Sequence, residues 1–244
     1  MMTKEEIQLP NGFTQLMIAV PTLSGEIRVQ TVSSLLRTTR MLVDYQIPYD
    51  IVFVIGNSAV ERARNELTKI FLDHDHFSHM LQIDSDMDWD EVEVLRLLSD
   101  NHDVVFGAGV KKRKPSYMQP QFAMTVLDRE SPVCPLCGCI EVKAGGACFL
   151  MVSRKAIEQI MEKFPDLKYK SDTEEGEFLP AIFNPYLDEK TNLYYAEDIA
   201  FFHRWRETGG KVWLDPRIDL GHWGNARWSG DLKKLFSIMD SKEG

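Results

Sequence analysis

Apolar residues follow two alternating spacings along the first half of the chain. Short β-branched runs such as Asp50–Ile55 are typical of buried strands, whereas Val29–Tyr45 has apolar residues at helical spacing. The predicted strands are Gln15–Val20, Asp50–Ile55, His79–Ile83 and Asp103–Phe106, and the predicted helices are Val29–Tyr45, Ala59–Leu72 and Trp89–Leu98. This alternation of strand and helix predicts an α/β fold with a parallel, doubly wound sheet.

The second half of the chain is less regular. Its predicted elements are a turn at Gly145-Gly146, a strand at Ala147–Val152, a helix at Lys155–Phe164, a helix at Glu197–Glu207 and a short strand at Lys211–Leu214. The residues after Leu214 are rich in Trp and Gly, and we expect them to form irregular structure over an active site.

A cluster of carboxylates directly follows one of the predicted strands. His79–Ile83 leads into Asp84, Asp86 and Asp88, and the first two are spaced as D-x-D. Ligands of doubly wound sheets bind beyond the carboxyl ends of the strands. Clustered carboxylates repel one another unless a cation joins them, and Mn²⁺ and Mg²⁺ prefer oxygen ligands. The segment therefore predicts a divalent metal that holds a diphosphate, although Asp is also favoured at the start of a helix.

Two further features suit such a site. Glu197 and Asp198 open a predicted helix, where the helix dipole stabilises a carboxylate that can act as a base; a plain acidic helix start is the alternative. His222 lies within Gly221–Gly224, and glycines on both sides let the backbone approach a ligand. This setting favours metal or phosphate binding by His222 over a merely packed histidine.

Composition and charge narrow the function classes. The 244 residues are enough for a full core, as one domain or two abutting halves. The apolar runs are too short to cross a bilayer and the N-terminal residues lack an apolar signal-peptide core, so we expect a cytoplasmic protein with no membrane partner. A net charge of −9 argues against general nucleic-acid binding. The basic run Lys111–Lys114 is an exception that could meet a phosphate-bearing ligand.

The four cysteines allow two interpretations. Cys134, Cys137 and Cys139 form C-x-x-C-x-C, and with Cys148 they could hold a structural zinc ion. A second C-x-x-C is missing, however, and Cys148 lies in an apolar run. These two facts favour buried, reduced thiols over zinc.

The order of these features resembles the GT-A-fold nucleotide-sugar glycosyltransferases, above all their small viral and bacterial members with a D-x-D motif. The matching stretches, within roughly residues 15–231, are Ile18–Pro21, Ala63–Asn65, Ile83–Asp86, Gly145–Leu150, Ala196–Asp198, His222 with Gly224, and Ser229–Asp231. The resemblance implies a Rossmann-like, doubly wound mixed sheet with a smaller abutting acceptor-side subregion. It also implies a single domain over residues 1–244, with a nucleotide-sugar-binding half at about 15–110 and an acceptor and catalytic half at about 111–244.

The resemblance also assigns roles to residues. It implies that a nucleotide-sugar donor contacts Pro21, Thr22, Ser24, Arg62, Arg64, Asn65, Asp84, Ser85, Lys111, Gly145 and Gly146. It makes Asp86 the principal ligand of Mn²⁺ or Mg²⁺, completed by His222 and by Asp84. Asp198, or its neighbour Glu197, would deprotonate the acceptor hydroxyl.

The implied activity is the metal-dependent transfer of a sugar from a nucleoside-diphosphate sugar, with UDP the usual nucleotide, to a hydroxyl of a glycan or small molecule. If the protein is viral, its compartment would be the host cytoplasm. Two alternatives stay open. A phage-type DNA glycosyltransferase that modifies a hydroxymethylated base would suit the basic run but not the net charge. A nucleotidyltransferase-like α/β enzyme could use the same carboxylates.

Overall fold

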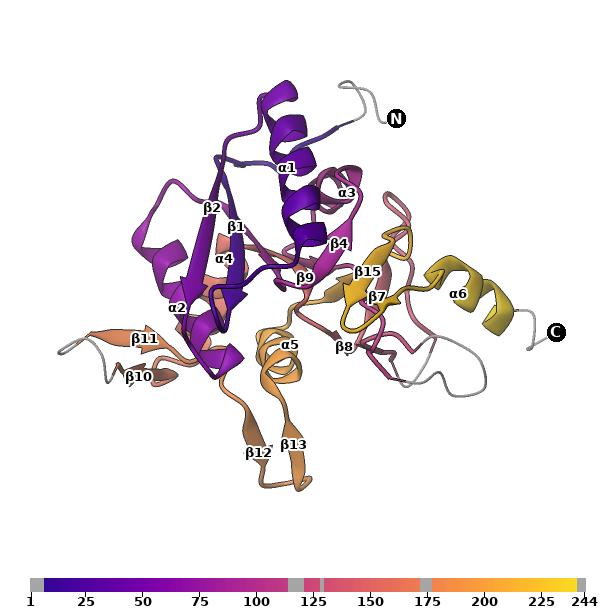
Figure 1. Ribbon diagram of the computed structural model, residues 1–244. Coiled ribbons are helices and arrows are strands. Elements are labelled where there is room, and N and C mark those ends of the chain that lie inside the picture. The colour runs from indigo at the N-terminus through magenta and orange to yellow at the C-terminus, as the bar shows by residue number, and fades with distance from the viewer. Residues whose placement is uncertain (1–6, 114–120, 128–129, 172–176, 241–244) are drawn as a thin grey trace.

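The computed structural model describes residues 7–113, 121–127, 130–171 and 177–240. A seven-stranded sheet forms its centre, in the order β2-β1-β3-β9-β5-β14-β7 (Figure 1). The strands are β2 (Tyr49–Ile55), β1 (Leu16–Thr22), β3 (His79–Ile83), β9 (Phe149–Ser153), β5 (Val104–Phe106), β14 (Val212–Leu214) and β7 (Ile140–Val142). Each strand that the hydrophobic pattern predicts in the first half is present, within a few residues of its expected ends.

The sheet is mixed. Strands β1, β2 and β3 run parallel, whereas β9 is antiparallel to both β3 and β5, so β5 has the same direction as β3. The edge strand β7 is antiparallel to β14. The parallel sheet predicted from the first half is therefore confirmed for its own four strands. The second half supplies the antiparallel strands β9 and β7 and also β14, which is parallel to β5. The hydrophobic pattern does not give these directions, because a buried apolar run has the same pattern in either direction.

Helices cover both faces of the sheet, as a doubly wound fold requires. Along β1 the side chains of Leu16, Ile18 and Val20 enter one core, and those of Met17 and Ala19 enter the other. This follows from the period of two in a strand. The first core includes α1 (Val29–Asp44) and α3 (Val92–Asp100), and the second includes α2 (Val60–Asp73), α4 (Arg154–Lys163) and α5 (Glu197–Glu207).

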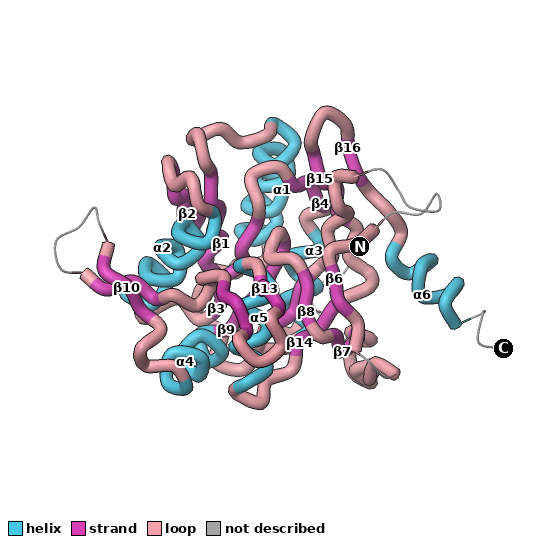
Figure 2. Tube along the Cα trace, turned by 90° about the horizontal axis from the view of Figure 1, so that it is seen from below, coloured by secondary structure: helices cyan, strands magenta, loops and turns pink. Residues whose placement is uncertain are grey.

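A small second sheet corrects the expectation of irregular structure after Leu214. Strands β15 (Leu220–Trp223) and β16 (Arg227–Trp228) pair with each other, and β15 also pairs with β4 (Met87–Trp89). The predicted helix at Trp89–Leu98 consequently begins only at Val92, because Met87–Trp89 joins this sheet. Helix α6 (Leu232–Asp240) follows β16 and extends away from the sheets (Figure 2).

Short antiparallel pairs complete the fold. They are β6 (Met124–Thr125) with β8 (Ala144–Gly145), β10 (Lys168–Lys170) with β11 (Phe178–Pro180), and β12 (Tyr186–Asp188) with β13 (Leu193–Tyr195). The last two pairs project from the body of the molecule (Figure 1). Among the described residues, no helix is both long and apolar enough to cross a membrane.

Candidate active site

Polar side chains gather where β1 and β3 end. The two strands run parallel, with Leu16 opposite His79, so their carboxyl ends share one edge of the sheet. Asp84 follows β3 directly, and its backbone N–H donates to the carbonyl of Cys148 at 3.1 Å. Asp84 is thereby fixed beside the start of β9, at the edge where doubly wound sheets bind their ligands.

A buried arginine holds Asp84 in place. Arg64, on α2, is only 2% exposed. Its guanidinium donates to Asp84 Oδ1 at 2.7 Å, to Gln82 Oε1 at 2.8 Å and to the carbonyl of Ala147 at 3.3 Å. Burial alone would lower the pKa of Arg64, but the charges of Asp84 and Glu197 outweigh it and raise that pKa. The arginine therefore remains charged and supplies the positive counterpart to the carboxylates at this edge.

His222 faces Asp86 across a short gap. Its Nε2 lies 3.4 Å from Asp86 Oδ1, and its Nδ1 lies 2.8 Å from the carbonyl oxygen of Val110. A carbonyl only accepts hydrogen bonds, so Nδ1 carries a proton, and in the neutral ring Nε2 then presents a lone pair to the carboxylate. Two acceptors that face each other need either a second proton on the ring or a metal ion. A histidine whose other nitrogen donates to a carbonyl is typical of metal ligands.

Pairing between β4 and β15 brings these two residues together. His222 lies opposite Met87 in that pairing, next to Asp86 in the chain. The backbone N–H of Trp223 also donates to the carbonyl of Asp86 at 2.8 Å. The D-x-D segment and the histidine are therefore positioned by backbone hydrogen bonds, although more than a hundred residues separate them in the sequence.

A lysine ammonium provides the positive charge at Asp86. Lys112 Nζ donates to Asp86 Oδ2, on the other side of the carboxylate from His222. Burial tends to raise the pKa of Asp86, but hydrogen bonds and charge from Lys112 and from His222, when its ring carries the second proton, outweigh burial and lower that pKa. The Asp86 carboxylate is thus ionised and attracts a cation, which is the property that a metal ligand needs.

Two more carboxylates lie close by, at the start of α5. Burial raises the pKa of both Glu197 and Asp198, and in Glu197 the charge of Asp198 adds to this effect. Asp198 Oδ1 accepts the backbone N–H of Ile199 at 2.7 Å. Its Oδ2 lies 3.9 Å from the place where a Cβ on Gly146 would stand. Asp198 is consequently a stronger base than an ordinary aspartate and faces the glycine turn.

Comparison with known proteins identifies the fold. No protein-family model and no curated protein sequence matches this chain. The crystal structure of A197 from STIV matches with a TM-score of 0.52 at 17% identity, over 91% of both chains. The structure of GalNAc-T7 with UDP, GalNAc and Mn²⁺ matches with a TM-score of 0.50 at 7% identity. The latter match covers 86% of this chain and 44% of GalNAc-T7.

The chain has a GT-A fold. At these identities the likeness concerns the fold alone, so the chemistry of this GT-A chain rests on its own residues. The structure brings together the carboxylates expected to be functional, Asp84 and Asp86 after β3 and Glu197 and Asp198 on α5, and places His222 against Asp86.

Two residues of α2 with predicted donor contacts have other partners. Asn65 is fully buried, donates to Asn184 Oδ1 at 2.7 Å and accepts the N–H of Phe183 at 2.9 Å. Its amide therefore ties α2 to the residues before β12. Arg62 interacts with Tyr169 and lines a hollow on that side of the helix. The α-helix places residues two apart on different faces, so of the two arginines only Arg64 is paired with Asp84.

Of the two glycines in the predicted turn, likewise, only one lies at the site. A Cβ on Gly145 would lie 2.1 Å from the ring of Phe106, so packing in the core explains this glycine. Gly146 is the one that lies beside Asp198. In the basic run, Lys111 is exposed and its backbone N–H donates to the carbonyl of Gln121, while Lys112 reaches the site. Lys114 lies outside the described residues.

The remaining predicted donor contacts lie along the strand ends. Pro21 and Thr22 are buried at the end of β1, and Thr22 Oγ1 accepts the N–H of Gly25 at 3.1 Å. Ser24 is exposed in the turn that follows. Ser85 uses its carbonyl to accept the N–H of Arg28 at 3.0 Å, which joins the turn after β3 to the start of α1.

An ion pair that the sequence does not reveal supports the small sheet. Asp88 accepts from Arg227 at 2.8 and 2.9 Å and also from the indole N–H of Trp223. An aspartate of this segment could also begin a helix, but the Asp88 side chain holds β16 and β15 against β4 instead. The only sequence signal for this role was that Asp88 belongs to the same acidic run as Asp84 and Asp86.

Proposed function

We propose that this chain is a metal-dependent glycosyltransferase. It transfers a sugar from a nucleoside-diphosphate sugar, with UDP the first candidate, to a hydroxyl of a glycan or small molecule. The observation that carries the proposal is the Asp86–His222 pair, in which Val110 directs the His222 lone pair toward a carboxylate. The GT-A fold supports it, as does the presence of UDP, GalNAc and Mn²⁺ in the GalNAc-T7 structure.

The residues present fit a divalent metal. Asp86 and His222 would hold Mn²⁺ or Mg²⁺, with Asp84 as a further ligand or a partner of the donor ribose, and the Lys112 ammonium already marks the place as one that accepts a cation. When bound, the metal supplies Lewis-acid stabilisation of the charge that develops on the leaving diphosphate. Lys112, once released from Asp86, can pair with a phosphate oxygen of the donor.

The donor nucleotide would bind along the strand ends. Pro21, Thr22 and Ser24 follow β1 and would line the base and ribose, while Arg64 orients Asp84 through their 2.7 Å hydrogen bond. We assign the donor to the half at about 15–110 and the acceptor to the half at about 111–244. Lys112 and His222, from the second half, complete the metal site, so both halves are needed for donor binding.

Asp198 is the proposed base. Its raised pKa strengthens it as a proton acceptor, and its Oδ2 lies beside Gly146 in the glycine turn. The proton would pass from the acceptor hydroxyl to Asp198 Oδ2 as the hydroxyl oxygen attacks the anomeric carbon of the donor sugar. The bond from that carbon to the nucleoside diphosphate would break, and the diphosphate would leave. The positive charge of Arg64 partly offsets the negative charges of Glu197 and Asp198.

Titration calorimetry with UDP, in the presence and absence of Mn²⁺, tests the donor site. We expect Mn²⁺-dependent binding in the parent chain and at least about tenfold weaker binding in Asp86→Ala, because the principal ligand is lost. Asp90→Ala, a change at the exposed neighbouring carboxylate, is the matched control and should bind like the parent. UDP binding that does not depend on Mn²⁺ or Asp86 would refute the site.

Turnover provides the second test, with release of UDP from a UDP-sugar as the readout. Asp198→Asn should keep donor affinity and lower turnover by about 10²–10⁴-fold, the usual contribution of a general base. Unchanged turnover would remove Asp198 as the base. Pyrophosphate release from a nucleoside triphosphate would favour the nucleotidyltransferase alternative, and an acceptor affinity that falls steeply with salt would favour DNA.

A further inference from the structure

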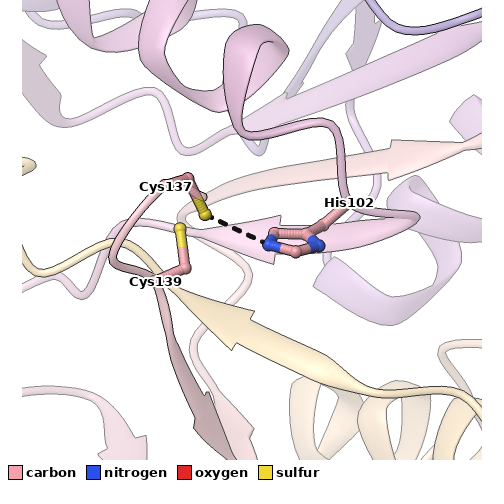
Figure 3. Close-up of side chains that lie close together, drawn as sticks. All are labelled: His102, Cys137 and Cys139. Carbon is pink, nitrogen blue, oxygen red and sulfur yellow. Dashed lines mark hydrogen bonds between the residues drawn. The ribbon is translucent and has the colours of Figure 1, made fainter. Parts of the chain in front are cut away.

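Away from the proposed donor site, two cysteines lie beside one histidine, and a third cysteine, Cys134, contacts one of them. Figure 3 shows the thiols of Cys137 and Cys139 and the ring of His102 directed toward one another. The two sulfur atoms and one ring nitrogen all lie within 4.8 Å of one another. Cys139 is fully buried, and Cys137 and His102 are half-buried. Such a group combines the ligand types that zinc prefers.

The spacing of these atoms suits a tetrahedral ion. His102 Nε2 lies 3.3 Å from Cys137 Sγ. A zinc ion with Zn–S bonds of about 2.3 Å and Zn–N bonds of about 2.0–2.1 Å separates its sulfur and nitrogen ligands by about 3.6 Å. The two side chains therefore stand close to the separation that a shared zinc ion requires, and only a small side-chain adjustment would complete it.

Backbone hydrogen bonds position the sulfur atoms in the turn before β7. The backbone N–H groups of Cys137 and Leu136 donate to the Cys134 sulfur. The N–H of Cys139 donates in the same way to the Cys137 sulfur. Gly138, at φ +78°, closes the turn with a 2.9 Å bond to the Cys134 carbonyl. These backbone hydrogen bonds hold the sulfur atoms of the turn in place.

The fourth ligand differs from the one that the sequence suggested. Cys148 does not belong to this group: its Sγ lies 2.7 Å from the position of a Cβ on Gly109, beside Asp84. His102, in the connection between α3 and β5, takes its place. The His102 ring stacks on Trp213 with centroids 4.4 Å apart and planes 11° apart, which fixes the direction of its nitrogen atoms.

We propose that Cys134, Cys137, Cys139 and His102 bind a structural Zn²⁺ ion. Cys134 contacts the Cys137 thiol and completes a Cys₃His set, a common composition of closed zinc sites. Each thiol releases its proton to solvent as the metal binds. The ion ties the turn before β7 to the connection between α3 and β5, and so fixes the edge strand of the main sheet.

The surroundings of Cys139 favour a cation. Carboxylate oxygens of Asp100 and Asp215 and the Cys139 sulfur all lie within 4.8 Å of one another. Arg217 pairs with Asp100 at 2.6 Å and with Asp215 at 2.8 Å, so one guanidinium faces two buried carboxylates. A zinc ion bound by thiolates next to them would experience a favourable field, while Arg217 keeps both carboxylates out of the ligand set.

Metal analysis of the full chain, purified without chelator, tests the proposal directly. We expect about one zinc per chain, retained in Asp86→Ala because the donor site is separate. Cobalt added to the zinc-free protein should produce the sulfur-to-metal charge-transfer bands and the intense visible bands of a tetrahedral thiolate site. A parent chain that contains no zinc and gives no such bands would overturn the proposal.

Variants identify the ligands. Cys137→Ser and His102→Ala should each bind zinc at least about tenfold more weakly, whereas Cys148→Ser and His76→Ala, an exposed histidine, should retain it. His102→Cys should bind zinc more tightly than His102→Ala and should show a shifted cobalt spectrum. A purely structural role for His102 would not produce that spectral shift. Loss of zinc in Cys148→Ser with retention in His102→Ala would overturn the assignment.

Discussion

Replacing Arg64 with methionine should destabilise the fold through the acceptors that it leaves behind. The guanidinium is buried, and its removal leaves two acceptors, Gln82 Oε1 and the Ala147 carbonyl, without their donor. Both belong to residues that are no more than 2% exposed. Each buried neutral group left without a partner costs about 1–3 kcal/mol. Loss of the hydrogen bond to Asp84 adds little to the cost, because the Asp84 side chain is 29% exposed and water can replace the arginine. A buried Met recovers part of the loss, since an apolar side chain costs less to bury than a charge. We expect a net loss of about 2–4 kcal/mol.

Urea unfolding at pH 7 measures this loss, and Arg62→Met is the matched control. Arg62 lies on the same helix but is only partly buried, so its replacement should cost less than about 1 kcal/mol. Combining Arg64→Met with Asp84→Asn in a double-mutant cycle separates the ion pair from the two neutral acceptors. An equal loss in both arginine variants, or a loss below about 1 kcal/mol in Arg64→Met, would refute the reasoning, since the acceptors would then have found other partners.

Two pH dependences follow from other carboxylates. Burial raises the pKa of Glu93 from 4.5 to about 7, so the folded state binds its proton more tightly than the unfolded chain; this stability is complete below pH 4.5 and is lost as pH rises through about 7. Glu93→Gln should therefore be more stable than the parent by up to about 3 kcal/mol at pH 8 but not at pH 4.5, and equal differences at both pH values in thermal unfolding would contradict this. The raised pKa of Asp198 should place the acid limb of the UDP-release rate above the range of an ordinary aspartate, because activity is lost as Asp198 gains a proton; a limb that persists in Asp198→Glu at the same pH would argue for another group.

Hydrophobic periodicity predicted most of the sheet and its covering helices, because those elements are defined by local spacing. It failed where tertiary pairing overrides local preference. Met87–Trp89 has the composition of a helix start, yet pairing with β15 makes it a strand. The hydrophobic pattern also could not predict the direction of β9, since an apolar strand between two neighbours can pair with them in parallel or antiparallel orientation.

The same distinction explains which site residues the sequence revealed. D-x-D and C-x-x-C have members that are close in the chain, so spacing alone marks them as candidate ligands, although for the cysteines the sequence favoured reduced thiols over zinc. Their complements come from distant segments: Lys112 reaches Asp86 through the loop after β5, and His102 reaches Cys137 from the turn before β5. The sequence around a single lysine or histidine does not indicate which distant residue it contacts. His222 was found only because its flanking glycines and the resemblance pointed to it.

The two proposed metal sites differ in chemistry in a way that keeps them independent. Asp86 and His222 offer oxygen and nitrogen at a partly open edge, where Mn²⁺ or Mg²⁺ can exchange with the Lys112 ammonium. The cysteine turn offers sulfur in a closed setting beside buried Cys139, which selects a softer ion. A strong zinc chelator should accordingly lower the melting temperature of the chain, while excess Mg²⁺ should not restore it. Donor binding, in contrast, should respond to Mg²⁺ or Mn²⁺ and not to zinc occupancy, because the cation proposed for the first site is the one that would contact the diphosphate.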